Sequence, residues 1–152
     1  TIEQTQKCGY DVIRIIKYIH SMGYLHRDVK PENFLFGIGN ESKKMYAIDF
    51  GLSKRFLDDN NTHIPMKHHK KFTGTIRYLS TNVHEGNEPS RRDDLISVGY
   101  MLMFLLKGVL PWQKIKQKSR DYLKIRILYP MPMILLHHCL RFYLFRMTPA
   151  PR

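Results

Sequence analysis

An α+β fold that is mainly helical is predicted by three patterns in this chain of 152 residues. Apolar residues recur at helical spacing over residues 3–22, which predicts an amphipathic helix. Two short apolar stretches, residues 33–36 and 45–48, flank a polar turn that contains glycine and predict a β-hairpin. Residues 94–106 are apolar nearly all round, so they predict a buried helix rather than a surface one.

The boundaries of these elements follow from local residue types. The first helix is indicated by Val12, Ile15, Ile16 and Ile19, and we expect Gly23 to end it as a C-cap. Residues 52–90 show no sustained periodicity and are predicted to form a long loop. Loops of that length are uncommon unless they are functional.

Two groups of polar residues border the predicted hairpin. The run His-Arg-Asp-Val-Lys-Pro-Glu-Asn occupies residues 26–33, and Asp49-Phe50-Gly51 follows the return strand. A hairpin would bring Asn33 and Asp49 to neighbouring loop ends, where both side chains can hold one ion. Transfer of a γ-phosphoryl group to a hydroxyl needs a proton acceptor, a cation near the phosphate and two oxygen ligands for magnesium. Asp28, Lys30, Asn33 and Asp49 offer these groups in that order.

The two groups together resemble the catalytic loop of protein kinases, H-R-D-x-K-x-x-N followed by D-F-G. The resemblance implies ATP and Mg²⁺ as cofactors, with Asn33 and Asp49 as magnesium ligands and Asp28 as the group that accepts or orients the hydroxyl proton. A small-molecule phosphotransferase of kinase-like fold is the nearest alternative. Lys30 and the run Gly-Thr-Ile-Arg-Tyr at residues 74–78 favour a protein substrate.

Three further roles come from the same resemblance. Thr75 resembles the threonine that ties the activation segment to the catalytic aspartate. His26 is expected to be structural and to pack behind the Asp-Phe-Gly turn. Asp94 is expected to accept backbone N–H groups of the catalytic loop, because a buried carboxylate is costly unless it is hydrogen-bonded.

Several segments are more specifically similar to the casein kinase I family. Residues 26–35 read His-Arg-Asp-Val-Lys-Pro-Glu-Asn-Phe-Leu, and Ser-Arg-Arg-Asp-Asp-Leu at residues 90–95 matches that family. Ser-Thr-Asn at residues 80–82 differs by one residue from the family's S-I-N, where most kinases have A-P-E. The resemblance covers about residues 5–113 and implies the large, C-terminal lobe of a protein-kinase-like fold.

The resemblance also implies a preference for acidic or phospho-primed serine/threonine substrates. Arg27, Lys54 and Lys70 match family positions around an anion pocket, and Arg77 matches a second basic site. Cations that converge on one pocket suit a phosphate or a cluster of carboxylates. Ordinary solvated surface charges are the alternative interpretation.

Composition sets the remaining expectations. The net charge of +12 could indicate nucleic-acid binding, but the basic residues are spread along the chain without an RNA-reading aromatic motif. The two cysteines, Cys8 and Cys139, lie far apart and fit a reduced protein of the cytoplasm or nucleus. We expect a monomer that binds protein substrates and no nucleic acid.

Two departures from the kinase pattern qualify these expectations. The chain contains no Gly-rich phosphate loop, no V-A-I-K lysine and no partner glutamate, and it begins with Thr1 rather than Met. We therefore expect a piece of a longer protein, with little activity alone. Residues 1–126 are interpreted as a partial kinase domain and residues 127–152 as a divergent apolar tail. Prolines, histidines and an arginine interrupt the apolar run, so no membrane span is expected.

Three function classes remain open. The first is the catalytic lobe of a serine/threonine kinase of the casein kinase I type. The second is a non-catalytic binding module for acidic or phosphorylated protein segments. The third is a nucleic-acid binder, for which steep salt dependence of affinity would be the sign.

Overall fold

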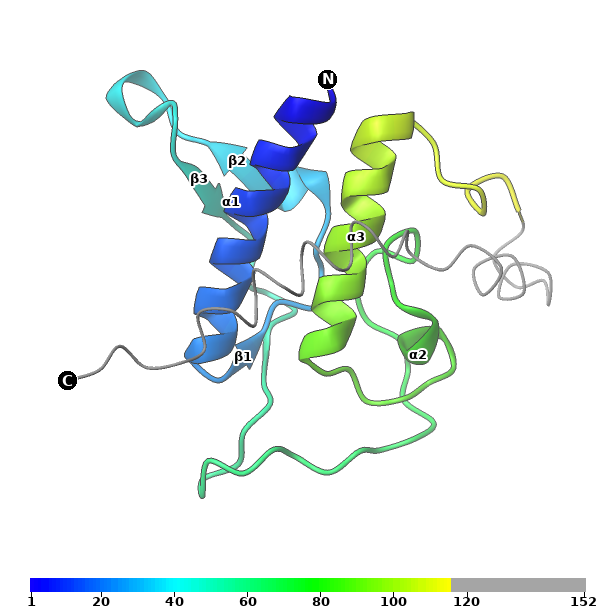
Figure 1. Ribbon diagram of the computed structural model, residues 1–152. Helices are drawn as coiled ribbons and strands as arrows, with labels where there is room; N and C mark the ends of the chain where they lie inside the picture. Colours follow the sequence, from blue (N-terminus) through cyan, green and yellow to red (C-terminus); the bar gives the residue numbers. More distant parts are fainter. Residues whose placement is uncertain (116–152) are drawn as a thin grey trace.

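The computed structural model describes residues 1–115, and the predicted tail at residues 127–152 lies outside that part, as does Cys139. The described part is an α+β structure in which two long helices lie side by side and two small sheets flank them (Figure 1). Its helices are α1 (Ile2–Ser21), α2 (Thr81–His84) and α3 (Arg91–Lys107), with short 3₁₀ turns at Pro31–Asn33 and Gly39–Glu41. Its strands are β1 (Tyr24–Leu25), β2 (Phe34–Phe36), β3 (Met45–Ala47) and β4 (Lys54–Arg55).

The predicted amphipathic helix is confirmed as α1. Its buried face carries Val12, Ile13, Ile16 and Ile19 and packs against α3. Gly9 allows the close approach of the two helices, since a Cβ at that position would lie 2.9 Å from Leu102 Cδ1. Gly23 follows the helix in the left-handed conformation (φ 82°), and its N–H donates to the His20 carbonyl at 3.0 Å. The C-cap itself is Met22, so the glycine expected as the cap lies one residue beyond it.

The predicted hairpin is also confirmed, with shifted boundaries. β2 and β3 pair antiparallel in a register that sets Phe34 opposite Ala47. Asn33 was expected to begin the first strand, but it belongs to the 3₁₀ turn that Pro31 opens, and its N–H donates to the Lys30 carbonyl at 3.1 Å. The return strand ends at Ala47, although Ile48 N still donates to Asn33 O at 3.0 Å.

The prediction of an unstructured loop over residues 52–90 is partly wrong. That segment contains β4, which pairs antiparallel with β1, and the short helix α2. Leu57 and His63 form a further isolated bridge. β1 and β4 have two residues each, too few to give a clear periodic signal, and their pairing with each other is non-local. α2 has four residues and is capped locally by Ser80, whose Oγ accepts the Val83 N–H at 3.1 Å.

The predicted buried helix is α3, which begins at Arg91 and not at residue 94. Ser90 N donates to Asp93 Oδ2 at 2.7 Å, and this contact fixes the first turn. Burial extends through Met103, but Leu105 and Leu106 are about two-fifths exposed, so the expectation of burial is wrong for the last turn. Within residues 1–115 no helix is both long and apolar enough to cross a bilayer.

The core lies between α1 and α3 and is closed by residues that follow α3. Trp112 is fully buried, donates its indole N–H to the Arg77 carbonyl at 2.9 Å, and meets the Tyr100 ring edge-on at 4.8 Å. The indole therefore anchors the segment after α3 to the segment before α2.

Candidate functional site

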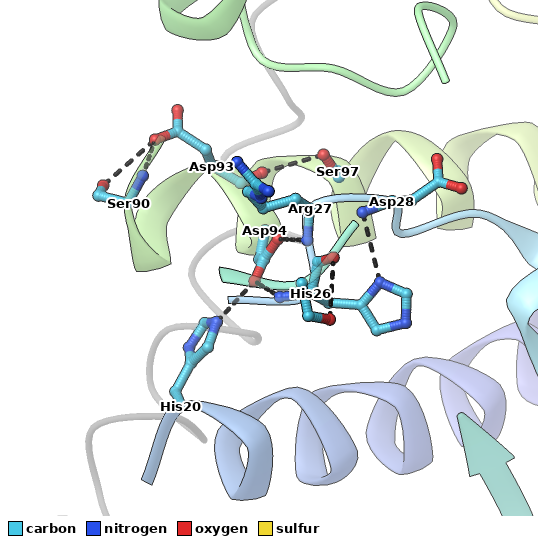
Figure 2. Close-up of polar contacts among 9 residues, drawn as sticks. His20, His26, Arg27, Asp28, Ser90, Asp93, Asp94 and Ser97 are labelled. Carbon is cyan, nitrogen blue, oxygen red and sulfur yellow. Dashed lines mark hydrogen bonds and ion pairs between the residues drawn. The ribbon is translucent and has the colours of Figure 1, made fainter. Parts of the chain in front are cut away.

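The loop after β1, residues 26–30, is fixed to α3 by one buried carboxylate. Asp94 accepts the backbone N–H of His26 through Oδ2 and that of Arg27 through Oδ1, both at 2.9 Å (Figure 2). Three hydrogen-bond donors, counting the ring described next, offset the cost of burying this charge. The loop is thereby held with Arg27 in the left-handed region (φ 67°).

The third donor is His20, which the sequence analysis missed. Its Nε2 lies 2.8 Å from Asp94 Oδ2, and both side chains are buried. A polar residue on the apolar face of a predicted helix was the only available signal, because the two partners are 74 positions apart in sequence.

Asp28 is the centre of the site, and three other predicted residues contact its carboxylate. Its Oδ1 accepts hydrogen bonds from Thr75 N at 2.9 Å and Thr75 Oγ1 at 2.7 Å. Its Oδ2 accepts from Lys30 Nζ at 2.6 Å and from Asn33 Nδ2 at 3.2 Å. The structure therefore brings Asp28, Lys30, Asn33 and Thr75 together.

These contacts determine the charge states of Asp28 and Lys30. Burial raises the pKa of Asp28, but hydrogen bonds from Lys30 and Thr75 outweigh it, so that pKa lies below its ordinary value. The hydrogen bond to Asp28 raises the pKa of Lys30, and the nearby charge of Asp49 adds to the effect. Asp28 is therefore an anion and Lys30 a cation at neutral pH.

Asn33 and Asp49 lie at the same end of the hairpin, as its backbone pairing requires. Asn33 O accepts from Ile48 N, the residue before Asp49. Asp49 is exposed, has a left-handed backbone (φ 60°), and accepts Gly51 N at 3.3 Å through Oδ1. The Asn33 amide nitrogen donates to the Asp28 carbonyl at 2.9 Å, so its amide oxygen is the atom left for a cation. One carboxylate and one amide oxygen form a donor set that suits magnesium.

His26 lies behind the turn at residues 49–51. Its ring is fully buried, with its centroid 5.3 Å from that of Phe50 and stacked against Phe34 at 5.8 Å. Its Nδ1 accepts the Asp28 N–H at 3.3 Å (Figure 2). The ring thus contacts both the loop that carries Asp28 and the turn at residues 49–51.

The four basic residues expected to bind anions do not all lie at one site. Lys54 Nζ lies 2.6 Å from Glu88 Oε1, and Lys70 Nζ lies 3.8 Å from Glu88 Oε2. Burial lowers the pKa of Arg27, while the charges of Glu88 and Asp94 act in the opposite direction. The Arg27 guanidinium itself donates from Nε to the Leu52 carbonyl at 2.6 Å. Arg77 is elsewhere, with its guanidinium 5.4 Å from the centre of the Phe104 ring.

Glu88 is therefore a second residue that the sequence analysis missed. A single glutamate in a segment without periodicity gives no sign that two lysines earlier in the chain, Lys54 and Lys70, pair with it. We call Arg27, Lys54, Lys70 and Glu88 the basic cluster.

Comparison with known proteins identifies the family. A model of the protein kinase domain matches residues 1–142. The match covers nearly the whole chain and extends beyond residue 126, where the sequence analysis placed the end of the kinase-like part. Domains of this family generally use ATP and Mg²⁺, and the three helices and few strands of residues 1–115 correspond to part of their fold. The chain belongs to the protein kinase domain family.

Proposed function

We propose that this protein kinase is a serine/threonine kinase of the casein kinase I type, built on the large lobe of the fold. It would transfer the γ-phosphate of ATP to hydroxyls in acidic or phospho-primed protein segments. The observation that carries the proposal is the contact set around Asp28, in which a buried anion faces a lysine, an asparagine and a threonine at 2.6–3.2 Å.

Each residue of that set would have one task. Asp28 would accept or orient the proton of the substrate hydroxyl, a contribution of about 10²–10⁴-fold to the rate. Lys30 would balance the negative charge that grows on the transferred group. Asn33 and Asp49 would hold magnesium, which neutralises charge on the ATP phosphates. Thr75 would keep Asp28 oriented.

The assignment to casein kinase I type rests on the sequence around α2 and α3. Ser80 and Asn82 from the Ser-Thr-Asn run both donate to the buried carboxylate of Asp93, at 2.6 Å and 3.2 Å to Oδ1. Asp93 is part of the Ser-Arg-Arg-Asp-Asp-Leu run that resembles the same family. The family-like residues thus form one network rather than scattered matches, which supports a shared segment geometry.

A second candidate function is a non-catalytic module that binds acidic or phosphorylated protein segments. The basic cluster favours it, since Lys54 and Lys70 are 35% and 45% exposed at the side chain and can reach a ligand in solvent. Such a module would need the cluster but not Asp28.

Phosphate transfer by the protein separates the two candidates. We would measure transfer from ATP to an acidic serine peptide, a phospho-primed peptide and a neutral one, with Mg²⁺ present. Asp28→Asn and Asp49→Asn should each lower the rate at least about 10²-fold. Asp59→Asn is the matched control, because this carboxylate is fully exposed and, among residues 1–115, forms an ion pair with Arg55 alone.

Unchanged activity in Asp28→Asn would refute the catalytic assignment. Peptide binding without any transfer, unaffected by Asp28→Asn, would support the binding module instead. Equal rates on the acidic, phospho-primed and neutral peptides would refute the substrate preference.

A further inference from the structure

The basic cluster already contains an anion of its own. Glu88 is 6% exposed, and its carboxylate lies between Lys54 at 2.6 Å and Lys70 at 3.8 Å. The two contacts are unequal: Oε1 forms a short hydrogen-bonded ion pair, whereas the buried Oε2 has no hydrogen-bond partner among residues 1–115. One side of this carboxylate is therefore firmly held and the other loosely held.

The backbone fixes Glu88 in this position. Glu88 N donates to the Lys67 carbonyl and Lys70 N donates to the Gly86 carbonyl, both at 2.8 Å. These bonds hold residues 67–70 against residues 86–88, which keeps the backbone of Glu88 beside that of Lys70. The Glu88 carboxylate is therefore a built-in competitor for any anion that approaches the two lysines.

The charges of the cluster do not cancel. Glu88 pairs with two lysines, Lys54 and Lys70, and the charges of Glu88 and Asp94 both act on Arg27, so three cations face two carboxylates and a positive excess remains. Of the two lysines, Lys70 is the more exposed and the farther from Glu88, so it is the cation that can turn toward a ligand at least cost. A doubly charged phosphate attracts such a cation more strongly than a single carboxylate does.

We propose that Glu88 is the internal counter-ion of the basic cluster and makes it select phosphorylated over merely acidic segments. The carboxylate of Glu88 competes with a ligand carboxylate of equal charge, but a phosphate draws Lys70 away from it. The inference rests on the proposed preference for acidic or phospho-primed substrates. It adds that phospho-primed segments bind more tightly than acidic ones.

The test compares the binding of two peptides to the full chain by titration calorimetry. One peptide carries phosphoserine and the other carries aspartate at the same position, and inorganic phosphate serves as competitor. Glu88→Gln removes the counter-ion while keeping the side-chain shape. We expect this substitution to increase the affinity for the aspartate peptide at least about fivefold and to reduce the preference for the phosphoserine peptide. Glu85→Gln, which changes an exposed carboxylate three residues earlier, should leave both affinities within about twofold.

A second variant protects the test against loss of folding. Glu88→Asp keeps the charge but withdraws the carboxylate by one methylene, which frees Lys70 and should also reduce the preference for phosphoserine. Circular dichroism and thermal melting establish whether each variant is folded. If Glu88→Gln is not folded, the preference for phosphoserine is compared between Glu88→Asp and the unchanged chain, and that comparison tests the counter-ion role.

The outcomes distinguish this inference from the proposed function. If Lys70→Gln abolishes phosphoserine binding while both Glu88 variants keep the original preference, the counter-ion role is refuted and the anion pocket stands. If the unchanged chain binds neither peptide, and inorganic phosphate produces no heat, the pocket itself is refuted and the inference with it.

Discussion

His20 Nε2 and Asp94 Oδ2 are 2.8 Å apart in the buried space between α1 and α3. The same carboxylate accepts the N–H groups of His26 and Arg27, so one side chain joins two helices and the loop that carries Asp28 (Figure 2). The arrangement makes the position of Asp28 depend on the packing of the helices. Residues that never touch a substrate should therefore affect both stability and activity.

Replacing His20 should test that dependence first. His20→Ala removes one of three donors to a buried carboxylate, so we expect the free energy of unfolding to fall by about 1–3 kcal/mol. Urea denaturation measures the change. Arg14→Ala, an exposed position on the same helix, is the control and should change stability by less than about 0.5 kcal/mol. Equal effects of the two variants would contradict the role of His20.

The coupling between His20 and Asp94 is a separate prediction. Asp94→Asn should be more destabilising than His20→Ala, because it also weakens the bonds to the loop backbone. In the double variant the two losses should not add, and we expect a coupling free energy of about 1–3 kcal/mol. Additivity to within about 0.3 kcal/mol would show that the residues act independently.

The lowered pKa of Asp28 predicts how stability changes with acidity. A carboxyl whose folded pKa lies below its ordinary value of 3.8 stabilises the fold above that value. This stabilisation is lost as pH falls through the folded pKa. The stability difference between the unchanged chain and Asp28→Asn should hold steady above about pH 5 and shrink at lower pH. Denaturation curves from neutral pH to about pH 3 check this, and a difference independent of pH would contradict it.

Local sequence was enough to predict the long elements. α1 has a periodic apolar face, α3 has a continuous apolar run, and the hairpin has two apolar stretches about a turn, so each carries its own signal. The grouping of Asp28, Lys30 and Asn33 was equally accessible, because these residues lie within one short loop and contact one another directly.

The parts that escaped prediction are those made by long-range contacts. β1 and β4 have two residues each and exist only because Tyr24 pairs with Arg55 and Leu25 with Lys54. His20 and Glu88 acquire their roles from partners 74 and 34 positions away. The long-range contacts of Asp94 and Thr75 were predicted through the family resemblance, whereas a two-residue strand, His20 and Glu88 had neither periodicity nor a matching family position, so only the folded chain reveals their partners.

Gly74 offers a test of how closely the segment before Thr75 approaches the catalytic loop. Its φ is +107°, and a Cβ there would collide with the Arg27 carbonyl oxygen and lie 3.1 Å from Leu79 Cδ2. Gly74→Ala should therefore displace Thr75 from Asp28 and cost about 2–4 kcal/mol of stability.

Gly39 provides the matched control for that substitution. It also has a left-handed backbone (φ +57°), but a Cβ there would meet nothing within 4 Å. Gly39→Ala should cost only about 1–2 kcal/mol, the conformational penalty alone. Thermal denaturation of both variants separates the conformational penalty from the cost of the steric collision. Equal losses of stability would contradict the close approach at Gly74.

Asp93 provides the last prediction, since its buried carboxylate joins the segment before α3 to the start of that helix. Oδ1 accepts from Ser80 Oγ at 2.6 Å, and Oδ2 accepts from Ser90 N at 2.7 Å. Asp93→Ala leaves these donors without their acceptor, so we expect a loss of about 2–4 kcal/mol and faster hydrogen exchange across residues 80–90.

Arg92→Ala separates this network from simple surface pairing. Arg92 Nε lies 3.8 Å from Asp93 Oδ2, but its side chain is 60% exposed, and such pairs contribute at most about 1 kcal/mol. Stability and exchange in this variant should stay close to those of the unchanged chain. If Arg92→Ala and Asp93→Ala accelerate exchange equally, the segment is held by the ion pair and not by the buried hydrogen bonds, and the account of Asp93 as its anchor is wrong.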